Sequence, residues 1–321
     1  MKSSLHIYCD NVIEATWFRN LHPDLQNLDY RIIRGRGENT RVVEDLIQYD
    51  RPDIILANDS RAFLVVEKTR EVPTGHNVGQ RVARLVKAVE NGVPTIKFFP
   101  FDAKKHGEYS AICNLNIRLL LAFDNMWNIH NCPIIALNWK ADKHGELIDD
   151  GSEDDELKSV MYDFVGSGFS SSCARFPKIR EDTKNEYSRR LTARPQYGGP
   201  PPSVTFENTD SFLSRLKCEL SIPDRLSLQS RAESLVYTII MTEEKCKRQD
   251  PYTGTQFIYD YAYCRSGRTP EEKKRNLVLF FPKIRKAVWE RKNPNNAFTK
   301  SCNWYLVANA LVFSDGIKIL R

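Results

Sequence analysis

The fold of this chain is decided by PDIILANDSRAFLVVEKT, the stretch at residues 52–69. Two short apolar runs flank the polar residues 58–61, so the stretch predicts a β-hairpin with a four-residue turn. Because side chains alternate along a strand, Glu67 and Lys68 point to opposite faces. The turn would fold Asp53, on the first strand, against Glu67, on the second.

Two acidic side chains beside apolar strands need a partner. A bare buried carboxylate is very costly to desolvate, and a second carboxylate adds repulsion unless a cation lies between the two. Mg²⁺ satisfies both groups, so we expect Asp53 and Glu67 to hold one or two Mg²⁺ ions. The simpler alternative is a hairpin end that carries ordinary charged residues.

The composition is that of a soluble globular protein. The chain has 321 residues, of which 41% are hydrophobic, enough for one large domain or for a core with a second lobe. The N-terminal residues lack the apolar stretch of a secretory signal, and no run approaches the roughly 20 apolar residues of a membrane span. We therefore expect a cytoplasmic protein without membrane contact. The eight cysteines are scattered singly, which indicates reduced thiols rather than a disulfide framework or a zinc site.

Positive charge is concentrated in the second half. Residues 1–165 contain 20 Lys and Arg against 25 Asp and Glu, whereas residues 166–321 contain 27 against 16. Such a basic half suits a polyanionic partner, although a well-solvated basic surface is the alternative. We expect a catalytic core over 1–165 and a basic DNA-binding, recognition and dimerisation region over 166–321, or one domain that integrates both.

The segments around the hairpin alternate between helix and strand. A helix over 39–49 leads into the hairpin, a second helix is expected over 78–90, and a strand over 93–99. The strand-helix-strand step implies a right-handed crossover that places the last strand parallel to the second hairpin strand. The sequence therefore predicts an α/β fold with a mixed central sheet flanked by helices.

Later segments continue this pattern. The basic segment 175–197 carries interspersed aromatic side chains and could wrap a nucleic acid. The remaining expected elements are helices over 112–129 and 227–246 and strands over 132–139, 276–281, 303–313 and 316–320.

The hairpin, the segment EVPTGHNVGQR at residues 71–81 and the order helix, strand, strand, helix, strand resemble the PD-(D/E)XK nuclease superfamily, and within it the type II restriction endonucleases. This resemblance covers about residues 39–100. It implies an αβββαβ core and Mg²⁺-dependent hydrolysis of phosphodiester bonds in double-stranded DNA, with Asp53 and Glu67 as metal ligands. A palindromic target would require a homodimer, because each subunit cuts one strand.

The third position of the motif, normally lysine, is Thr69 in this chain. In such enzymes the lysine helps to orient or activate the attacking water. Thr69 could hold the water itself. Lys68 could reach the site from the opposite face of its strand, or Lys97 from the adjoining strand could supply the charge. The Gln80 amide could order the water or the phosphate. A glutamate before the first strand often joins such sites, which nominates Glu44 as a further metal ligand.

The resemblance also implies contacts to DNA. We expect base-reading side chains from residues 175–197 or 247–275 and phosphate contacts near the motif, although a loop histidine such as His76 is more often only a surface group. The nominated DNA-binding residues are His76, Arg81, Arg175, Lys178, Arg180, Arg189, Arg190 and Arg194.

A second stretch fits the written motif better. Pro223-Asp224 is followed by Glu243, Glu244 and Lys245, so that the motif lysine is present. The intervening residues repeat at helical spacing, and a helix would separate Asp224 from Lys245 by about 30 Å. We therefore prefer Asp53 and Glu67.

Two other functions stay open. The Thr69 substitution favours a nucleic-acid-binding protein that keeps a degenerate nuclease core. A nuclease for RNA or single strands would instead stack bases on Tyr259, Tyr261 and Tyr263.

Overall fold

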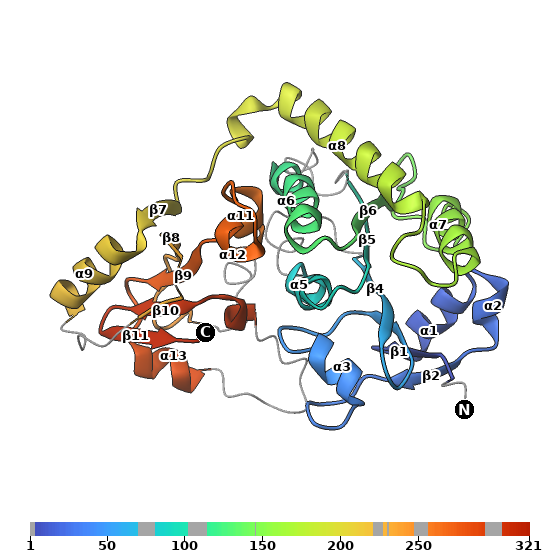
Figure 1. Cartoon of the computed structure of the whole chain (residues 1–321), viewed down its shortest axis with the longest axis horizontal. Coiled ribbons are helices and arrows are strands. Elements are labelled where there is room, and N and C mark those ends of the chain that lie inside the picture. The colour runs from blue at the N-terminus through green and yellow to red at the C-terminus, as the bar shows by residue number, and fades with distance from the viewer. Residues whose placement is uncertain are drawn as a thin grey trace.

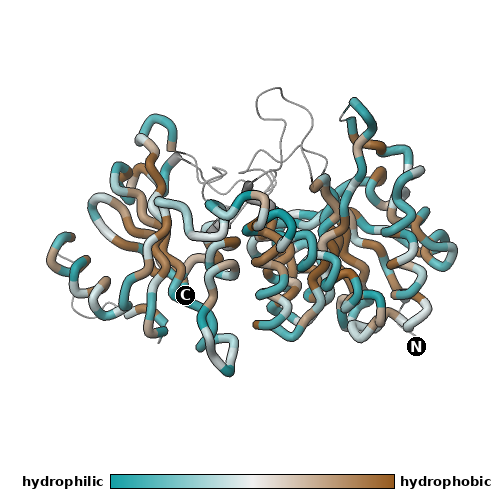
Figure 2. The backbone as a smooth tube through the Cα atoms, turned by 90° about the horizontal axis from the view of Figure 1, so that it is seen from above, coloured by the Kyte–Doolittle hydropathy of each residue, from teal (hydrophilic) through white to brown (hydrophobic). Residues whose placement is uncertain are grey.

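The structure is a computed structural model with two β-sheets and helices between and around them (Figure 1). Figure 2 shows the apolar segments gathered in the strands of both sheets and in the helices between them. The residues that the structure describes are 4–69, 81–101, 114–144, 146–220, 227–229, 231–246, 256–292 and 304–321.

The first sheet has six strands in the order β2-β1-β3-β4-β5-β6. β3 and β4 form the expected antiparallel hairpin, and β5 runs parallel to β4, as the crossover predicts. β1 is antiparallel to β3, whereas β2 and β6 are parallel to their neighbours, so the sheet is mixed. The strands are β1 His6–Cys9, β2 Asp29–Ile32, β3 Ile54–Ala57, β4 Ala62–Lys68, β5 Thr95–Phe99 and β6 Ile134–Asn138.

Helices cover both faces of this sheet (Figure 1). Ile55 and Val65 pack on the side of α3, α5 and α6, whereas Ile54 and Val66 pack on the side of α1, α7 and α8. Because the inner strands are buried on both faces, they read as nearly continuous apolar runs. The helices are α1 Val12–Arg19, α2 Pro23–Gln26, α3 Arg41–Leu46, α5 Ala83–Glu90, α6 Asn114–His130, α7 Asp155–Gly166 and α8 Arg175–Ala193.

The second sheet has five strands in the order β11-β10-β9-β8-β7. Its three inner strands are parallel, and both edge strands are antiparallel to their neighbours. The elements of this part are η2 Pro195–Tyr197, β7 Val204–Asn208, α9 Thr209–Leu220, β8 Glu233–Thr238, α11 Gln256–Ala262, α12 Pro270–Lys273, β9 Asn276–Phe281, α13 Lys286–Lys292, η3 Trp304–Val307, β10 Ala310–Phe313 and β11 Gly316–Ile319.

One hydrophobic core joins the two sheets. Val65 of β4, Phe123 of α6, Tyr261 of α11 and Leu279 of β9 belong to the same buried cluster. The Asn125 amide donates a 2.9 Å hydrogen bond from α6 to the Tyr261 carbonyl in α11. The helices between the sheets thus bind the two halves of the chain together.

The expected boundary at residues 165/166 falls within the first layer. α8 lies beyond it in the chain, yet its Phe176 and Ile179 pack in one cluster with Ile135 and Leu137 of β6. The second sheet begins only with β7. The basic segment 175–197 is therefore largely one helix packed on the first sheet.

The helix expected over 227–246 is wrong, because β8 occupies the middle of that range. Its apolar residues recur at helical spacing, but Leu235 and Val236 are buried on opposite faces of the second sheet. A strand buried on both faces loses the alternation by which it could be distinguished from a helix. The helical distance used against the alternative motif therefore does not apply, and Asp224 lies outside the described residues.

Two expectations from composition can be compared with the described part of the chain. None of its helices is long and apolar enough to cross a membrane. Its six cysteines are free thiols, namely Cys9, Cys132, Cys173, Cys218, Cys246 and Cys264.

Candidate functional site

Asp53 and Glu67 converge as the hairpin predicts, and an arginine lies between them. The Arg84 Nη1 atom is 3.3 Å from Asp53 Oδ1 and 2.9 and 3.1 Å from the two Glu67 oxygens. All three side chains are almost fully buried, with exposed fractions of 5%, 0% and 6% for Asp53, Glu67 and Arg84. The guanidinium is thus the cation that the two carboxylates require.

The register of the hairpin explains this convergence. Asp53 immediately precedes β3, and Ile54 pairs with Val66 across the hairpin, so the antiparallel ladder brings Asp53 beside Glu67. The backbone N–H of Lys68 donates a 2.8 Å hydrogen bond to Asp53 Oδ2. Backbone geometry therefore fixes the position of this carboxylate.

A third carboxylate holds the arginine from the other side. Arg84 Nε donates a 2.7 Å hydrogen bond to Asp50 Oδ2, and Asp50 is only 1% exposed. Asp50 precedes β3, whereas Arg84 lies in the first turn of α5, which packs on the same face of the sheet. We call Asp50, Asp53, Glu67 and Arg84 the site cluster.

Lys97 and Thr69 extend the site cluster on one side. Lys97 lies in β5 in register with Glu67 and is fully buried. Its ammonium donates a 3.1 Å hydrogen bond to Thr69 Oγ1, and the Thr69 hydroxyl is 3.5 Å from Glu67 Oε1. Of the residues proposed to replace the motif lysine, Thr69 and Lys97 therefore lie at the carboxylates, in contact with one another.

Within the site cluster, electrostatics distinguish Asp53 from Glu67. Burial, followed by the neighbouring Glu67 charge, raises the pKa of Asp53 to about 8. Burial would also raise the pKa of Glu67, but Arg84, Lys97 and Arg81 together lower it below its ordinary value. Burial lowers the pKa of Lys97 to about 7, against the opposing effect of Glu67. Glu67 is therefore the more firmly ionised carboxylate.

The donor chemistry of the site cluster suits a hard divalent cation, since carboxylate oxygens are the ligands that Mg²⁺ prefers. Asp53 and Glu67 present their oxygens to one point, as a metal ligand pair must. That point is occupied by Arg84 Nη1. Within the described residues, no three His, Cys, Asp or Glu side chains form a group that could hold a metal ion.

Lys68 and Glu44 lie away from this point. The Lys68 ammonium packs 4.3 Å from the Trp17 ring centroid and 4.7 Å from that of Trp139, on the face of β4 opposite Glu67. The Glu44 carboxylate accepts hydrogen bonds from the backbone N–H groups of Gly37 and Asn39. Glu44 therefore stabilises the loop before α3 in this structure.

The residues nominated from segment 71–81 are only partly described. Gln80 and His76 lie outside the described residues. Arg81 pairs with Glu67, with 3.4 Å between Nη1 and Oε1, so it adds positive charge at the site cluster.

Several basic side chains of α8 are engaged within the protein. Arg190 is 1% exposed and donates to Glu186 and to the Phe101 carbonyl, so its guanidinium is buried within the protein in this structure. Arg180 pairs with Asp124 and Arg189 with Glu186. The other three nominated residues are exposed or half-buried: Arg175, Lys178 and Arg194.

The tyrosine cluster belongs to the core. Tyr259 and Tyr261 are 6% and 1% exposed, and Tyr259 stacks on Tyr237 and Tyr263. Tyr263 donates its hydroxyl proton to the Gly199 carbonyl. Two of the three rings therefore lack the exposed face that base stacking requires.

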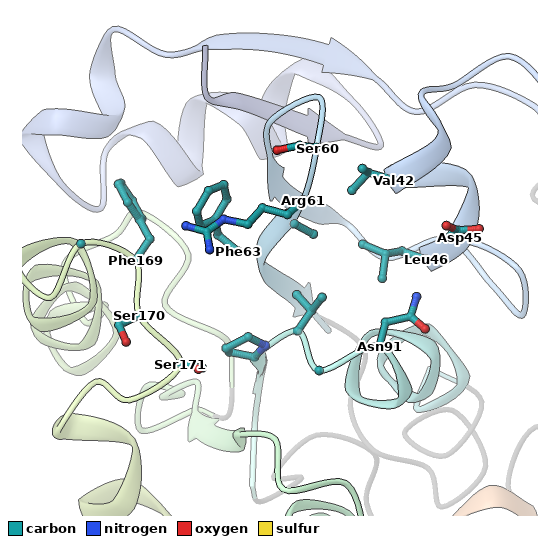
Figure 3. A pocket seen from close by; sticks show the side chains of 15 residues that line it. Val42, Asp45, Leu46, Ser60, Arg61, Phe63, Asn91, Phe169, Ser170 and Ser171 are labelled. Carbon is teal, nitrogen blue, oxygen red and sulfur yellow. The ribbon is translucent and has the colours of Figure 1, made fainter. Parts of the chain in front are cut away.

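A cavity of about 580 Å³ lies at the opposite end of the hairpin, around the β3–β4 turn (Figure 3). The Arg61 guanidinium carbon is 4.3 Å from the centroid of the Phe63 ring, and Phe63 makes an edge contact with Phe169. No member of the site cluster lines this cavity.

Asp50 and Arg84 are the functional candidates that sequence reasoning missed. The signal for Arg84 was its position one helical turn after Gln80, since residues four apart share a helix face. An arginine among the apolar residues of α5 also needs an acidic partner. Asp50 carried no comparable signal, because a carboxylate before a strand is ordinary.

Comparison with protein-family models, with curated proteins and with solved structures found no match.

Proposed function

We propose that this protein is a Mg²⁺-dependent endonuclease that hydrolyses DNA phosphodiester bonds. The observation that carries the proposal is the convergence of Asp53 and Glu67 on one cation-binding point, with Lys97 on the neighbouring strand. The order α3, β3, β4, α5, β5 around that point is the helix, strand, strand, helix, strand order on which the resemblance to the PD-(D/E)XK nucleases rests. Two strands, not three, separate α3 from α5 in the described residues, so the full αβββαβ core remains part of the proposal.

Each residue of the site has a role in this reaction. Asp53 and Glu67 would hold one or two Mg²⁺ ions, which supply a water of lowered pKa and neutralise charge on the phosphate. The Lys97 ammonium, held by Thr69, supplies the positive charge of the missing motif lysine from the adjacent strand. Thr69 and Lys97 would orient the attacking water or the phosphate oxygen beside it.

Double-stranded DNA is the proposed substrate, and a type II restriction endonuclease acting as a homodimer is the specific form that we favour. The supporting observation is the excess of Lys and Arg over Asp and Glu in the second half of the chain, 27 against 16 in residues 166–321. Basic side chains neutralise phosphates, while base edges are read in the grooves.

Cleavage of phage DNA tests the proposal. With Mg²⁺, the wild-type protein is expected to produce discrete fragments, and Asp53→Asn and Glu67→Gln are expected to produce none. Asp150→Asn, which removes an exposed carboxylate elsewhere, is the matched control and should cleave normally. Intact DNA in every lane, or cleavage by both site variants, would overturn the proposal.

A nucleic-acid-binding protein with a degenerate nuclease core is the second candidate. The specific observation in its favour is that Arg84 already neutralises both carboxylates. Retention of DNA in a gel-shift assay, with no cleavage under any divalent cation, would identify this function.

A further inference from the structure

We propose that Arg84 is a positioning residue that occupies the metal point of the site cluster and yields it to a divalent cation. This inference rests on the proposed metal site. It does not require that the reaction be DNA cleavage.

The first argument is geometric. A single atom, Arg84 Nη1, contacts Asp53 Oδ1 and both Glu67 oxygens at 2.9–3.3 Å. Mg²⁺ binds oxygen at about 2.0–2.1 Å, so the carboxylates would need to close by only about 1 Å around a metal at the same place. The guanidinium and the metal cannot both occupy that point, so the two cations must compete for it.

The second argument concerns where Arg84 goes. Its Nε is bound to Asp50, on the side away from the metal point, at 2.7 Å. Asp50 is itself fixed by the backbone N–H of Arg51, which donates a 2.8 Å hydrogen bond to its Oδ1. When Nη1 gives up Asp53 and Glu67, Arg84 can keep this carboxylate partner, so that the exchange leaves no buried charge alone.

The third argument is the balance of charge. Three buried acidic side chains, those of Asp50, Asp53 and Glu67, contact the Arg84 guanidinium, and Arg81 contacts Glu67 as a second cation. An uncompensated buried carboxylate is strongly destabilising. Arg84 therefore keeps the carboxylates converged before metal binds, and a divalent cation can replace it without loss of compensation.

Mn²⁺ binding is the direct test, measured by electron paramagnetic resonance on the full chain without DNA. Arg84→Gln removes the competing positive charge, and the loss of this repulsion is expected to tighten Mn²⁺ binding about tenfold relative to wild type. Asp50→Asn removes the carboxylate that keeps Arg84 paired after Nη1 leaves the metal point, so this variant is expected to bind Mn²⁺ more weakly than wild type. Arg84→Gln with Asp53→Asn should lose the gain.

Thermal unfolding supplies a second readout. Without metal, Arg84→Gln should unfold at a lower temperature than wild type, and Mg²⁺ should raise its midpoint more than that of wild type. If Arg84→Gln does not fold, the opposite shift expected for Asp50→Asn still tests the proposal. Unchanged or weaker Mn²⁺ binding by folded Arg84→Gln, or unchanged or tighter binding by Asp50→Asn, would overturn it.

The outcomes separate this inference from the proposed function. Tighter Mn²⁺ binding by Arg84→Gln together with intact DNA would retain cation exchange and reject the nuclease. Cleavage by the wild-type protein together with unchanged Mn²⁺ binding in the variants would do the reverse.

Discussion

Two charge clusters lie at opposite ends of α5, the first buried and the second partly buried. At its first turn, Arg84 belongs to the site cluster; at its last residue, Glu90 belongs to a second cluster with Asp260, Lys274 and Arg321. We call the second group the seam cluster. It joins α5 of the first layer to α11 and to Lys274 and Arg321, which flank strands β9 and β11 of the second sheet.

Each acid of the seam cluster lies beside at least one cation. Lys274 Nζ lies 4.0 Å from Glu90 Oε1 and 3.7 Å from Asp260 Oδ2, and Arg321 Nη1 lies 3.7 Å from Glu90. The Tyr49 hydroxyl donates a further 2.9 Å hydrogen bond to Glu90. With Lys87, whose Nζ lies 3.7 Å from Glu90 Oε2, two acids thus meet three cations, and two of these cations come from distant parts of the chain.

The site cluster differs in how its charges are joined. One guanidinium, that of Arg84, contacts all three of its acids, Arg81 adds a second positive charge at Glu67, and Lys97 contacts this group through Thr69. Its members all come from the stretch between Asp50 and Lys97. The comparison teaches that paired charges suffice to hold two layers together, whereas at the proposed metal site three acidic side chains converge on one guanidinium.

The largest expected effect separates the two clusters by activity. Glu67→Gln should reduce DNA cleavage by on the order of 10³-fold, because a charge that acts on the reacting phosphate is lost. Glu90→Gln, the same change in the seam cluster, should leave the cleavage rate of folded protein unchanged. Initial cleavage rates on a linear DNA fragment measure both variants. Equal losses of rate would mean that the two clusters do not differ in activity.

The two clusters should also differ in whether Mg²⁺ restores the stability that a substitution removes. Lys274→Met leaves Glu90 and Asp260 without their buried cation and is expected to cost about 3 kcal/mol in urea unfolding. Mg²⁺ should not restore this loss, in contrast to its effect on Arg84→Gln. A loss below about 1 kcal/mol would mean that the seam charges are solvated.

The two lysines beside the hairpin sharpen the assignment within the site. Lys97→Met should lower the cleavage rate by about 10²-fold, since it removes the only proposed lysine that contacts Thr69 among the described residues. Lys68→Met is the matched control on the opposite face and should change the rate less. A larger loss for Lys68→Met would transfer the role to that side chain.

The smallest effect concerns pH and the helix next to the seam cluster. Burial, and then Lys274, lower the pKa of His130 to about 4, while Glu90, Asp260 and Glu271 act in the opposite direction. A folded pKa below the unfolded one favours the neutral ring, so the free energy of unfolding should fall as the pH drops from about 6.5 to about 4.

After discounting for its partial exposure, His130 should contribute ~1–2 kcal/mol to this fall. His130→Gln should flatten the dependence in urea unfolding measured across that range, and the exposed His144→Gln should not. If the free energy of unfolding depends on pH identically in wild type and in His130→Gln, His130 does not contribute to this dependence.

Strands β3 to β6 of the first sheet could be predicted because their segments are locally consistent, whereas β1 and β2 were not among the expected elements. The hairpin turn, the apolar runs and α5 each carry their own signal, and the register then brings Asp53 to Glu67 without further information. The second sheet was harder. Leu235 and Val236 read equally well as helix, and only long-range pairing with β9 decides that they form a strand.

The candidate site shows the same division. Asp53, Glu67 and Lys97 follow from strand alternation and from the parallel pairing of β4 with β5. That a side chain rather than a metal holds the carboxylates depends on how deeply α5 packs, which the sequence pattern does not specify. The burial of Arg190 could not be predicted either, because the segment 175–197 was interpreted only as basic and not as a helix with one face on the sheet.

The locality of the site cluster has a consequence for biosynthesis. Contacts between nearby residues close quickly, and a chain folds from its N-terminal side as it leaves the ribosome. Asp53, Glu67 and Arg84 can therefore meet before Lys274 and Arg321 have been made. The nascent chain would therefore hold Asp53 and Glu67 already paired with Arg84. The second sheet would pack against the first layer afterwards.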